Sequence, residues 1–216
     1  MRTLGTELSV ELFAPANWTP HTVIPVTADY PGMRPTGSWI LRPDGELRGI
    51  DPCPSGWRDR QSGAAIDLSD RQLVLAYGSN PDPNKLLNRH GFLGGEPVIA
   101  LRAAVFGWAA AWCDGRRGDG AVVATLVPAP TRVEIHPVLA LTAHQLHKMN
   151  RWERDPTYYR KVPHQGLVML ESGEPARCVE VYLGTPEYRW ARHGDDGEHL
   201  LCAEVSYAEI DEMVDL

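Results

Sequence analysis

The sequence predicts an α+β fold in which a curved, mostly antiparallel mixed sheet or open barrel of about seven strands carries a few helices. Short runs rich in β-branched and aromatic residues recur between turn signals from residue 71 onward, which is typical of a sheet. Helical periodicity is confined to a few segments. The first 70 residues are crowded with proline and glycine, so long helices are not expected there.

Composition and charge narrow the class of protein. The 216 residues are 43% hydrophobic and 23% charged, which is ordinary for a soluble domain. The formal net charge of −7, without a basic stripe, argues against a nucleic-acid partner. Neither a membrane span nor a signal peptide is recognisable, so we expect a cytoplasmic protein with no membrane partner. Arginine far outnumbers lysine, which favours GC-rich coding and a bacterial source, and nothing indicates the oligomeric state.

Two regions are predicted: an ordered N-terminal arm over residues 1–70 and a main domain over residues 71–216. The arm is rich in proline and glycine, but it also holds Trp18, Trp39 and Trp57. Leaving that much apolar surface in water is unfavourable, at about 25 cal/mol per Å². We therefore expect the arm to pack on the main domain.

Within the arm, one stretch has the pattern of a β-hairpin. Residues 39–41 and 46–50 are strand-like runs that flank the turn sequence Pro43-Asp44-Gly45. The polar stretch over residues 51–63 is interpreted as the linker to the main domain.

The main domain is predicted to alternate short strands with helices. Asp82 is a favourable N-cap for a helix that begins at Pro83 and ends before Gly91. Thr142 and Gln145 have the capping-box pattern for a second helix. The expected strands cover residues 73–77, 97–113, 121–127, 133–141, 158–164, 166–171 and 176–183, and the expected helices cover residues 83–89, 143–154 and a short stretch after Ser206.

The second of these helices carries a carboxylate on its apolar face. At about 100° per residue, Glu153 lies one turn beyond Met149 and two turns beyond Leu146. An ionised carboxylate is costly to bury, so it must find partners or take up a proton. Such a group suits general acid–base catalysis. The alternatives are a structural anchor bonded to an arginine or tyrosine, and a side chain that simply emerges at the helix end.

The strand over residues 73–77 stops abruptly at Gly78 and a polar loop. Gly78 has no side chain, so the backbone can approach a ligand closely there. Amides of residues 78–80 can then bind a carbonyl or carboxylate oxygen, as in an oxyanion hole. The helix that begins near Pro83 adds the positive end of its dipole. A tight turn that needs glycine for its own geometry is the alternative, and the two needs are compatible.

These features together resemble the gamma-glutamylcyclotransferase family, which includes AIG2-like and BtrG-like proteins. The loop Tyr77, Gly78, Ser79 and Asn80 matches the family's YGSN loop, and "DGAVVATLVPAPT" matches the strand after its glycine-rich turn. Glu153 falls on the family's catalytic glutamate. The resemblance spans residues 70–185 and leaves out the arm.

The resemblance implies a reaction and a set of site residues. In that family the α-amine of a γ-glutamyl group attacks its own γ-carbonyl, which releases 5-oxoproline and a free amine. Glu153 would be the acid–base catalyst for a small γ-glutamyl substrate, and no metal or organic cofactor is expected. The residues implied to bind the substrate are Tyr77, Gly78, Ser79, Asn80, Tyr158 or Tyr159 in the following strand, and Tyr182.

The sequence departs from the family around the catalytic position. Asn150 replaces an aspartate, Arg154 replaces a glycine, and Pro137 replaces another glycine. The alternatives are therefore a non-catalytic relative that binds a carboxylated ligand or a partner protein, and a different acyl-transfer or elimination reaction. Arg154 borders the apolar stripe of the helix, so it either selects an anionic leaving amine at the pocket rim or pairs in solvent with Asp155.

Other constellations of chemically active residues are weaker. His144 and His147 are spaced for a metal ion, but no third ligand is apparent and exposed surface histidines are more common. Cys113 or Cys178 with a distant histidine would give a thiol nucleophile, whereas a buried inert cysteine in a strand is the usual case.

Overall fold

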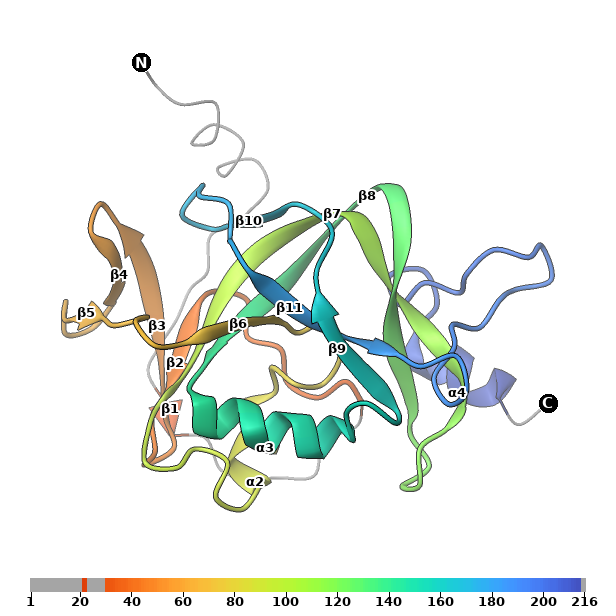
Figure 1. The fold of residues 1–216 in the computed structure, drawn as a ribbon, viewed down its shortest axis with the longest axis horizontal. Coiled ribbons are helices and arrows are strands. Elements are labelled where there is room, and N and C mark those ends of the chain that lie inside the picture. Colours follow the sequence, from red (N-terminus) through yellow and green to blue (C-terminus); the bar gives the residue numbers. More distant parts are fainter. Residues whose placement is uncertain (1–20, 23–29, 215–216) are drawn as a thin grey trace.

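The computed structural model describes residues 21–22 and 30–214, which form an α+β fold with few helices and one large open sheet (Figure 1). The strands are β1 (His21–Thr22), β2 (Trp39–Leu41), β3 (Glu46–Cys53), β4 (Gly56–Asp59), β5 (Ala65–Ile66), β6 (Gln72–Leu75), β7 (Val98–Arg116), β8 (Val122–Leu141), β9 (Tyr159–Pro163), β10 (Val168–Leu170) and β11 (Val179–Gly184). The helices are α2 (Pro83–Asn88), α3 (Ala143–Glu153) and α4 (Tyr207–Met213).

The sheet is mixed and open, as the sequence predicts. Its order is β5-β4-β3-β2-β7-β8-β6-β11-β9, with β1 beside β3 and β10 beside β7. Among the described strands β6 and β11 pair in parallel, and the other pairs are antiparallel. The expectation of about seven strands was too low, because the sheet has 11. The excess comes from the arm, because β1 to β5 lie there and join the same sheet.

The long hairpin of β7 and β8 is the centre of this sheet. The two strands have 19 and 20 residues, and β2, β6 and β10 all pair with one or the other. The sequence predicted separate strands over residues 121–127 and 133–141, whereas the structure has one strand, β8, across both. The pairing with β7 is nevertheless interrupted between them: Phe106 pairs with Val133 and Trp108 pairs with Pro128. Gly107, with a φ of 74°, therefore stands opposite residues 129–132 of β8, which have no partner in β7.

The arm joins the sheet through the predicted hairpin. β2 pairs with β3 on one side and with β7 on the other, where Trp39 lies opposite Ala100. The linker interpretation of residues 51–63 was wrong, because these residues form the end of β3 and the strand β4. Residues 1–20 and 23–29 of the predicted arm lie outside the described residues, as do residues 215–216, and the boundary at residue 70 stays a prediction.

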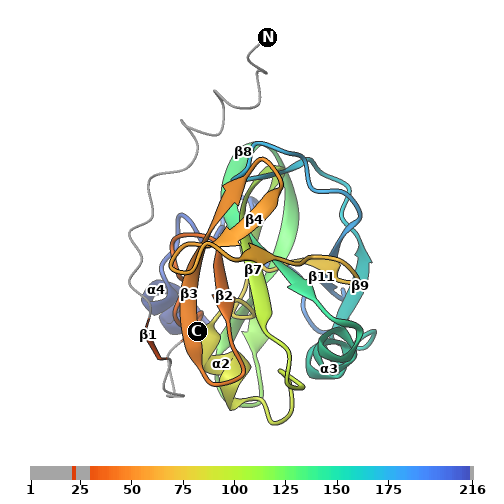
Figure 2. The ribbon, with the colours of Figure 1, turned by 90° about the vertical axis from the view of Figure 1, so that its left-hand side faces the viewer.

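The helices begin where their caps predict. Asp82 accepts a hydrogen bond from the Asn84 amide at the start of α2, and Thr142 and Gln145 form the capping box of α3. Ser206 caps α4 with a second capping box. α3 and α4 lie on opposite flanks of the sheet (Figure 2). In the described part of the chain, no helix is both long and apolar enough to cross a membrane; the cytoplasmic location stays a prediction.

We expect Gln145→Ala to lower the free energy of unfolding by about 2 kcal/mol, because three backbone carbonyls lose their hydrogen bonds to a buried side chain. Gln145 is fully buried, and its side-chain amide donates to the carbonyls of Leu93, Glu96 and Pro97 at 3.3, 3.1 and 3.3 Å. Denaturant unfolding measures the change. Gln165→Ala is the control, because the Gln165 amide donates to Pro163 at the surface. Equal stability of the two variants would contradict an anchoring role for Gln145.

Candidate active site

A cavity of about 560 Å³ opens where the loop after β6 meets the end of α3 and the turn between β7 and β8. Residues of β9 and β11 and of the loop after β11 complete its wall. The lining residues are Tyr30, Leu75, Ala76, Tyr77, Gly78, Ser79, Asn80, Arg89, Arg116, Arg117, Gly118, Asp119, Val123, Ala124, Trp152, Glu153, Arg154, Tyr158, Tyr159, Tyr182, Tyr188 and Arg189.

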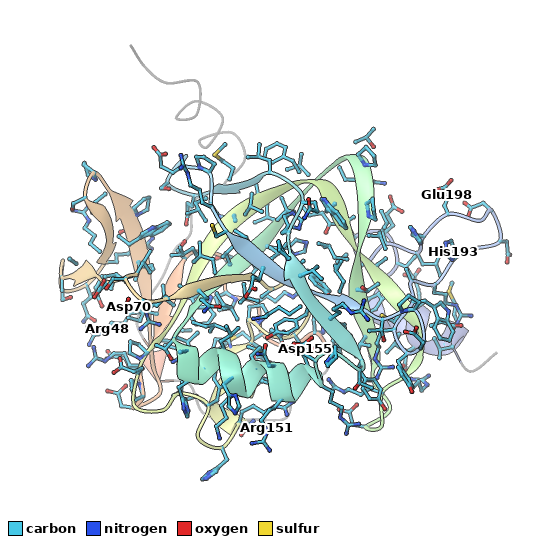
Figure 3. All side chains as sticks on the ribbon, in the orientation of Figure 1. Arg48, Asp70, Arg151, Asp155, His193 and Glu198 are labelled. Atoms are coloured by element: carbon cyan, nitrogen blue, oxygen red, sulfur yellow. The ribbon has the colours of Figure 1, made fainter. Side chains whose placement is uncertain are left out.

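Glu153 is the last residue of α3 and lines this cavity, as its place on the helical wheel predicts. Leu146 and Met149 on the same face of the helix are buried at 6% and 0% exposure. Arg151 points from the other side of α3, away from the sheet (Figure 3). The apolar face of α3 therefore carries the carboxylate inward as the helix docks.

The surroundings of Glu153 raise the pKa of its carboxyl group toward neutral pH. Burial raises the pKa of Glu153 from 4.5 to about 7, because the ionised form loses its hydration. A hydrogen bond from the Asn80 side chain and the positive charges of Arg89, Arg117 and Arg189 act in the opposite direction and lower this pKa. Glu153 can therefore both accept and release a proton near pH 7.

The loop over residues 77–80 forms the cavity wall that faces Glu153 and holds the carboxylate through Asn80. The Tyr77 hydroxyl donates to the Tyr182 carbonyl, which ties the start of the loop to β11. A Cβ atom on Gly78 would lie 3.1 Å from the Tyr30 hydroxyl. Glycine at residue 78 is thus explained by lack of space beside Tyr30, since its φ lies outside the left-handed region.

Three tyrosines line the wall formed by β9, β11 and the residue before β9. The Tyr159 hydroxyl donates to the Ala124 carbonyl at 3.1 Å, and the Tyr182 hydroxyl donates to the Asn150 side-chain oxygen. The Tyr158 ring lies 4.9 Å from the Tyr188 ring. Both Tyr158 and Tyr159 line the cavity, and which of them matches the family's tyrosine stays open.

Arginine side chains give the cavity a cationic character that the sequence analysis did not foresee. Arg89 is held over the Trp152 ring at 3.5 Å, and burial lowers the pKa of Arg89 to about 10. Arg189 is 8% exposed, and within the described residues its Nε atom has no hydrogen-bond partner. Arg154 and Arg189 lie 5.0 and 4.9 Å from the centre of the Tyr158 ring. An anionic ligand would compensate these charges.

All the residues predicted for the site line this one cavity, including Arg154. Their roles in binding and catalysis stay predictions. Arg154 occupies the C-cap of α3 with φ 52° and ψ 43°, a left-handed conformation that favours glycine. Among the wall residues that sequence reasoning missed are Tyr30, Arg89, Arg117 and Arg189. The turn "GRRGDG" gave a signal for Arg117, whereas nothing in the sequence links Tyr30 to the loop.

The weaker constellations gain no support from the structure. In residues 21–22 and 30–214, no group of three or more histidine, cysteine or acidic side chains is placed to hold a metal ion. The His144 Nε2 atom lies 2.8 Å from the Gly91 carbonyl oxygen. Cys113 is buried, which raises the pKa of its thiol to about 12 and keeps it protonated near neutral pH.

We compared the chain with known protein families, curated proteins and solved structures. No family model matches the sequence, and no curated protein does either. The chain is similar to gamma-glutamyl cyclotransferases. One such structure is 18% identical, with 53% of this chain and 67% of that chain covered and a TM-score of 0.43.

Two further solved structures show a similar degree of likeness. A yeast gamma-glutamyl cyclotransferase specific to glutathione is 18% identical, with 68% and 87% of the two chains covered and a TM-score of 0.39. A mouse AIG2-like protein is 15% identical, with 60% and 95% covered and a TM-score of 0.38. The names of these structures are those of the family that the sequence motifs resemble. Since all three TM-scores are below 0.5, only the cavity residues bear on function.

We expect Glu153→Gln to be more stable than the parent above pH 7, with the difference vanishing near pH 4. The folded protein holds the Glu153 proton up to about pH 7, whereas an ordinary glutamate loses it near pH 4.5, so the parent loses stability as the pH rises between these values. Glutamine has no proton to lose, and the gain at pH 8 should be on the order of 2–3 kcal/mol.

Urea unfolding of both proteins at pH 4, 6 and 8 measures this difference. Glu187→Gln in the loop after β11 is the control, because Glu187 is exposed. A constant difference between Glu153→Gln and the parent across the three pH values would show that the Glu153 carboxyl is not desolvated in the folded state.

Proposed function

We propose that the chain is a cofactor-independent cyclotransferase that cleaves a γ-glutamyl amide by attack of the substrate's own α-amine. The observation that carries the proposal is that Glu153 and the loop over residues 77–80 line one cavity. A carboxyl group with a pKa of about 7 there faces a loop of backbone amides. An intramolecular reaction needs orientation and proton transfer, and these two elements supply both.

The chemistry follows from the position of these two elements. The Glu153 carboxylate takes a proton from the α-ammonium of the substrate, and the free amine attacks the γ-carbonyl carbon. The carbonyl oxygen becomes negative and accepts hydrogen bonds from amides of residues 78–80. The bond to the leaving nitrogen then breaks as protonated Glu153 returns its proton to that nitrogen. The ionised Glu153 carboxylate next takes the second proton from the new ring nitrogen and releases it to solvent. The products are 5-oxoproline and the free amine.

The surrounding side chains support this assignment of roles. Asn150 stands where the family has an aspartate, but its side-chain oxygen still accepts a hydrogen bond from the Tyr182 hydroxyl. The departure at Asn150 therefore preserves a hydrogen-bond acceptor for a tyrosine in the wall. The cationic side chains of Arg154 and Arg189 beside Tyr158 favour a substrate whose leaving amine carries a negative charge.

The deciding experiment incubates the purified full-length chain with a panel of γ-glutamyl amides and measures 5-oxoproline. The panel contains acidic, neutral and basic leaving amines, and Glu153→Gln is the matched inactive variant. Release of 5-oxoproline by the parent alone supports the proposal. Ligand binding without any turnover across the panel would instead favour the non-catalytic alternative.

We expect kcat/KM to rise about tenfold per pH unit below pH 7 and to level off above it. The free enzyme must hold Glu153 ionised to take the α-ammonium proton, and its pKa is about 7. Glu153→Gln should lower kcat by about 10²- to 10⁴-fold, the usual size of general acid–base catalysis. A rate that is flat between pH 5 and pH 8 would assign the proton transfer to another group.

We expect Arg154→Gly to raise stability and to change substrate preference. Glycine adopts the left-handed conformation of this C-cap without the cost borne by arginine, a gain of about 1 kcal/mol. Loss of the guanidinium should reduce kcat/KM for γ-glutamyl amides of acidic amines more than for those of neutral amines. Arg160→Gly is the control in β9. Identical substrate profiles for Arg154→Gly and the parent would exclude Arg154 from substrate selection.

A further inference from the structure

The segment before β2 reaches the loop that follows β6. Arg34 lies in this segment, outside the residues 70–185 that resemble the cyclotransferase family. Its Nη2 atom donates to the Tyr77 carbonyl at 2.6 Å and to the Gly78 carbonyl at 2.9 Å. One guanidinium nitrogen therefore holds two successive carbonyl groups of the predicted substrate-binding loop.

These two bonds fix the direction of two backbone amides. In a trans peptide group the carbonyl and the N–H point to opposite sides. The described cis peptide bonds lie elsewhere, at Pro31 and Pro156. The Tyr77 carbonyl shares its peptide group with the Gly78 amide, and the Gly78 carbonyl shares its own with the Ser79 amide. Both amides consequently point away from Arg34.

The side opposite Arg34 is the cavity. Residues 77–80 line it, whereas Arg34 is not among its lining residues. Within the described part of the chain, no backbone carbonyl accepts a hydrogen bond from the Gly78 or the Ser79 amide. Two neighbouring N–H groups that point the same way form a concavity suited to an anion or a developing negative oxygen.

We propose that Arg34 is a positioning residue that sets the oxyanion-binding amides of Gly78 and Ser79. The identity of the bound oxygen, the γ-carbonyl oxygen of the substrate, rests on the proposed function. The guanidinium does not touch this oxygen. Its charge-assisted bonds hold both peptide groups in one orientation and polarise them, which strengthens the two N–H donors on the cavity side.

Tyr30, four residues before Arg34, contacts the same loop from inside the cavity. Its hydroxyl accepts a hydrogen bond from the Ala124 amide at 3.0 Å and would lie 3.1 Å from a Cβ atom at residue 78. Tyr30 and Arg34 therefore both lie beside Gly78, Tyr30 through its hydroxyl and Arg34 through the two carbonyl bonds. The segment over residues 30–34 is in this way part of the site, although it precedes the region of family resemblance.

The test compares Arg34→Met, which removes the donors, with Arg34→Lys, which keeps the charge. Arg42→Met is the control, since Arg42 is half-exposed and pairs with Asp44 and Glu46 in the turn between β2 and β3. Three quantities are measured on the full chain: the thermal unfolding midpoint, the ¹⁵N and ¹H shifts of the Gly78 and Ser79 amides, and kcat and KM for 5-oxoproline release.

We expect Arg34→Met to move the Gly78 and Ser79 resonances, because an amide nitrogen responds to hydrogen bonding at the preceding carbonyl. Its kcat should fall about 10- to 100-fold and its KM should change less than about threefold, since the two N–H bonds strengthen in the transition state. Arg34→Lys should recover part of the rate. The unfolding midpoint should match that of Arg42→Met.

Unchanged Gly78 and Ser79 resonances in Arg34→Met would overturn the inference, whether or not the parent is active. A parent that releases no 5-oxoproline while these resonances move would reject the proposed reaction and leave the orienting bonds supported. In an active parent, an unaltered kcat in Arg34→Met, or a loss of rate matched by a loss of thermal stability, would overturn the positioning role.

Discussion

The pairing of β7 with β8 is the interaction on which the rest of the molecule depends. This ladder continues beyond the irregularity at Gly107, and strands on both sides of it use the unpaired edges of the two long strands. β2 brings the arm to β7, and β6 brings the loop over residues 77–80 to β8. The far turn of the same hairpin supplies Arg117 to the cavity. Without this ladder the segments that form the cavity walls would not be held in fixed positions relative to one another.

The position of Glu153 illustrates how packing determines chemistry. The free energy that docks α3 comes from Leu146 and Met149, and the carboxylate is carried inward because it lies on their face. Burial destabilises the ionised form, and Asn80 and the nearby arginines offset part of that cost. The balance leaves a group that changes charge near pH 7. A fully exposed glutamate would be ionised at that pH and would return a proton poorly.

Local patterns in the sequence predicted the features that depend on neighbouring residues. The caps at Asp82 and Thr142, the hairpin in the arm and the inward face of α3 all follow from residues a few positions apart. The single strand β8 was not predictable in this way, because its two halves are held in line by pairing with β7 on either side of the irregularity at Gly107. Arg34 and Tyr30 escaped prediction for a related reason. Their partners lie more than 40 residues away, at a sequence separation of 43 for Arg34 and Tyr77 and 94 for Tyr30 and Ala124.

The wide sequence separation of the cavity walls has a consequence for the order of events in folding. The cavity walls come together only after most of the sheet has formed; they include residues 30, 78, 117, 153 and 189. The reason is that β6 must lie against both β8 and β11 before the loop over residues 77–80 and α3 face each other. Contacts between distant segments carry a large loop-closure entropy and form slowly. During refolding, backbone structure should therefore appear before a competent cavity. A chain still emerging from the ribosome lacks a wall of this cavity until β11 has been made, so Glu153 does not reach its buried position on a partly made protein.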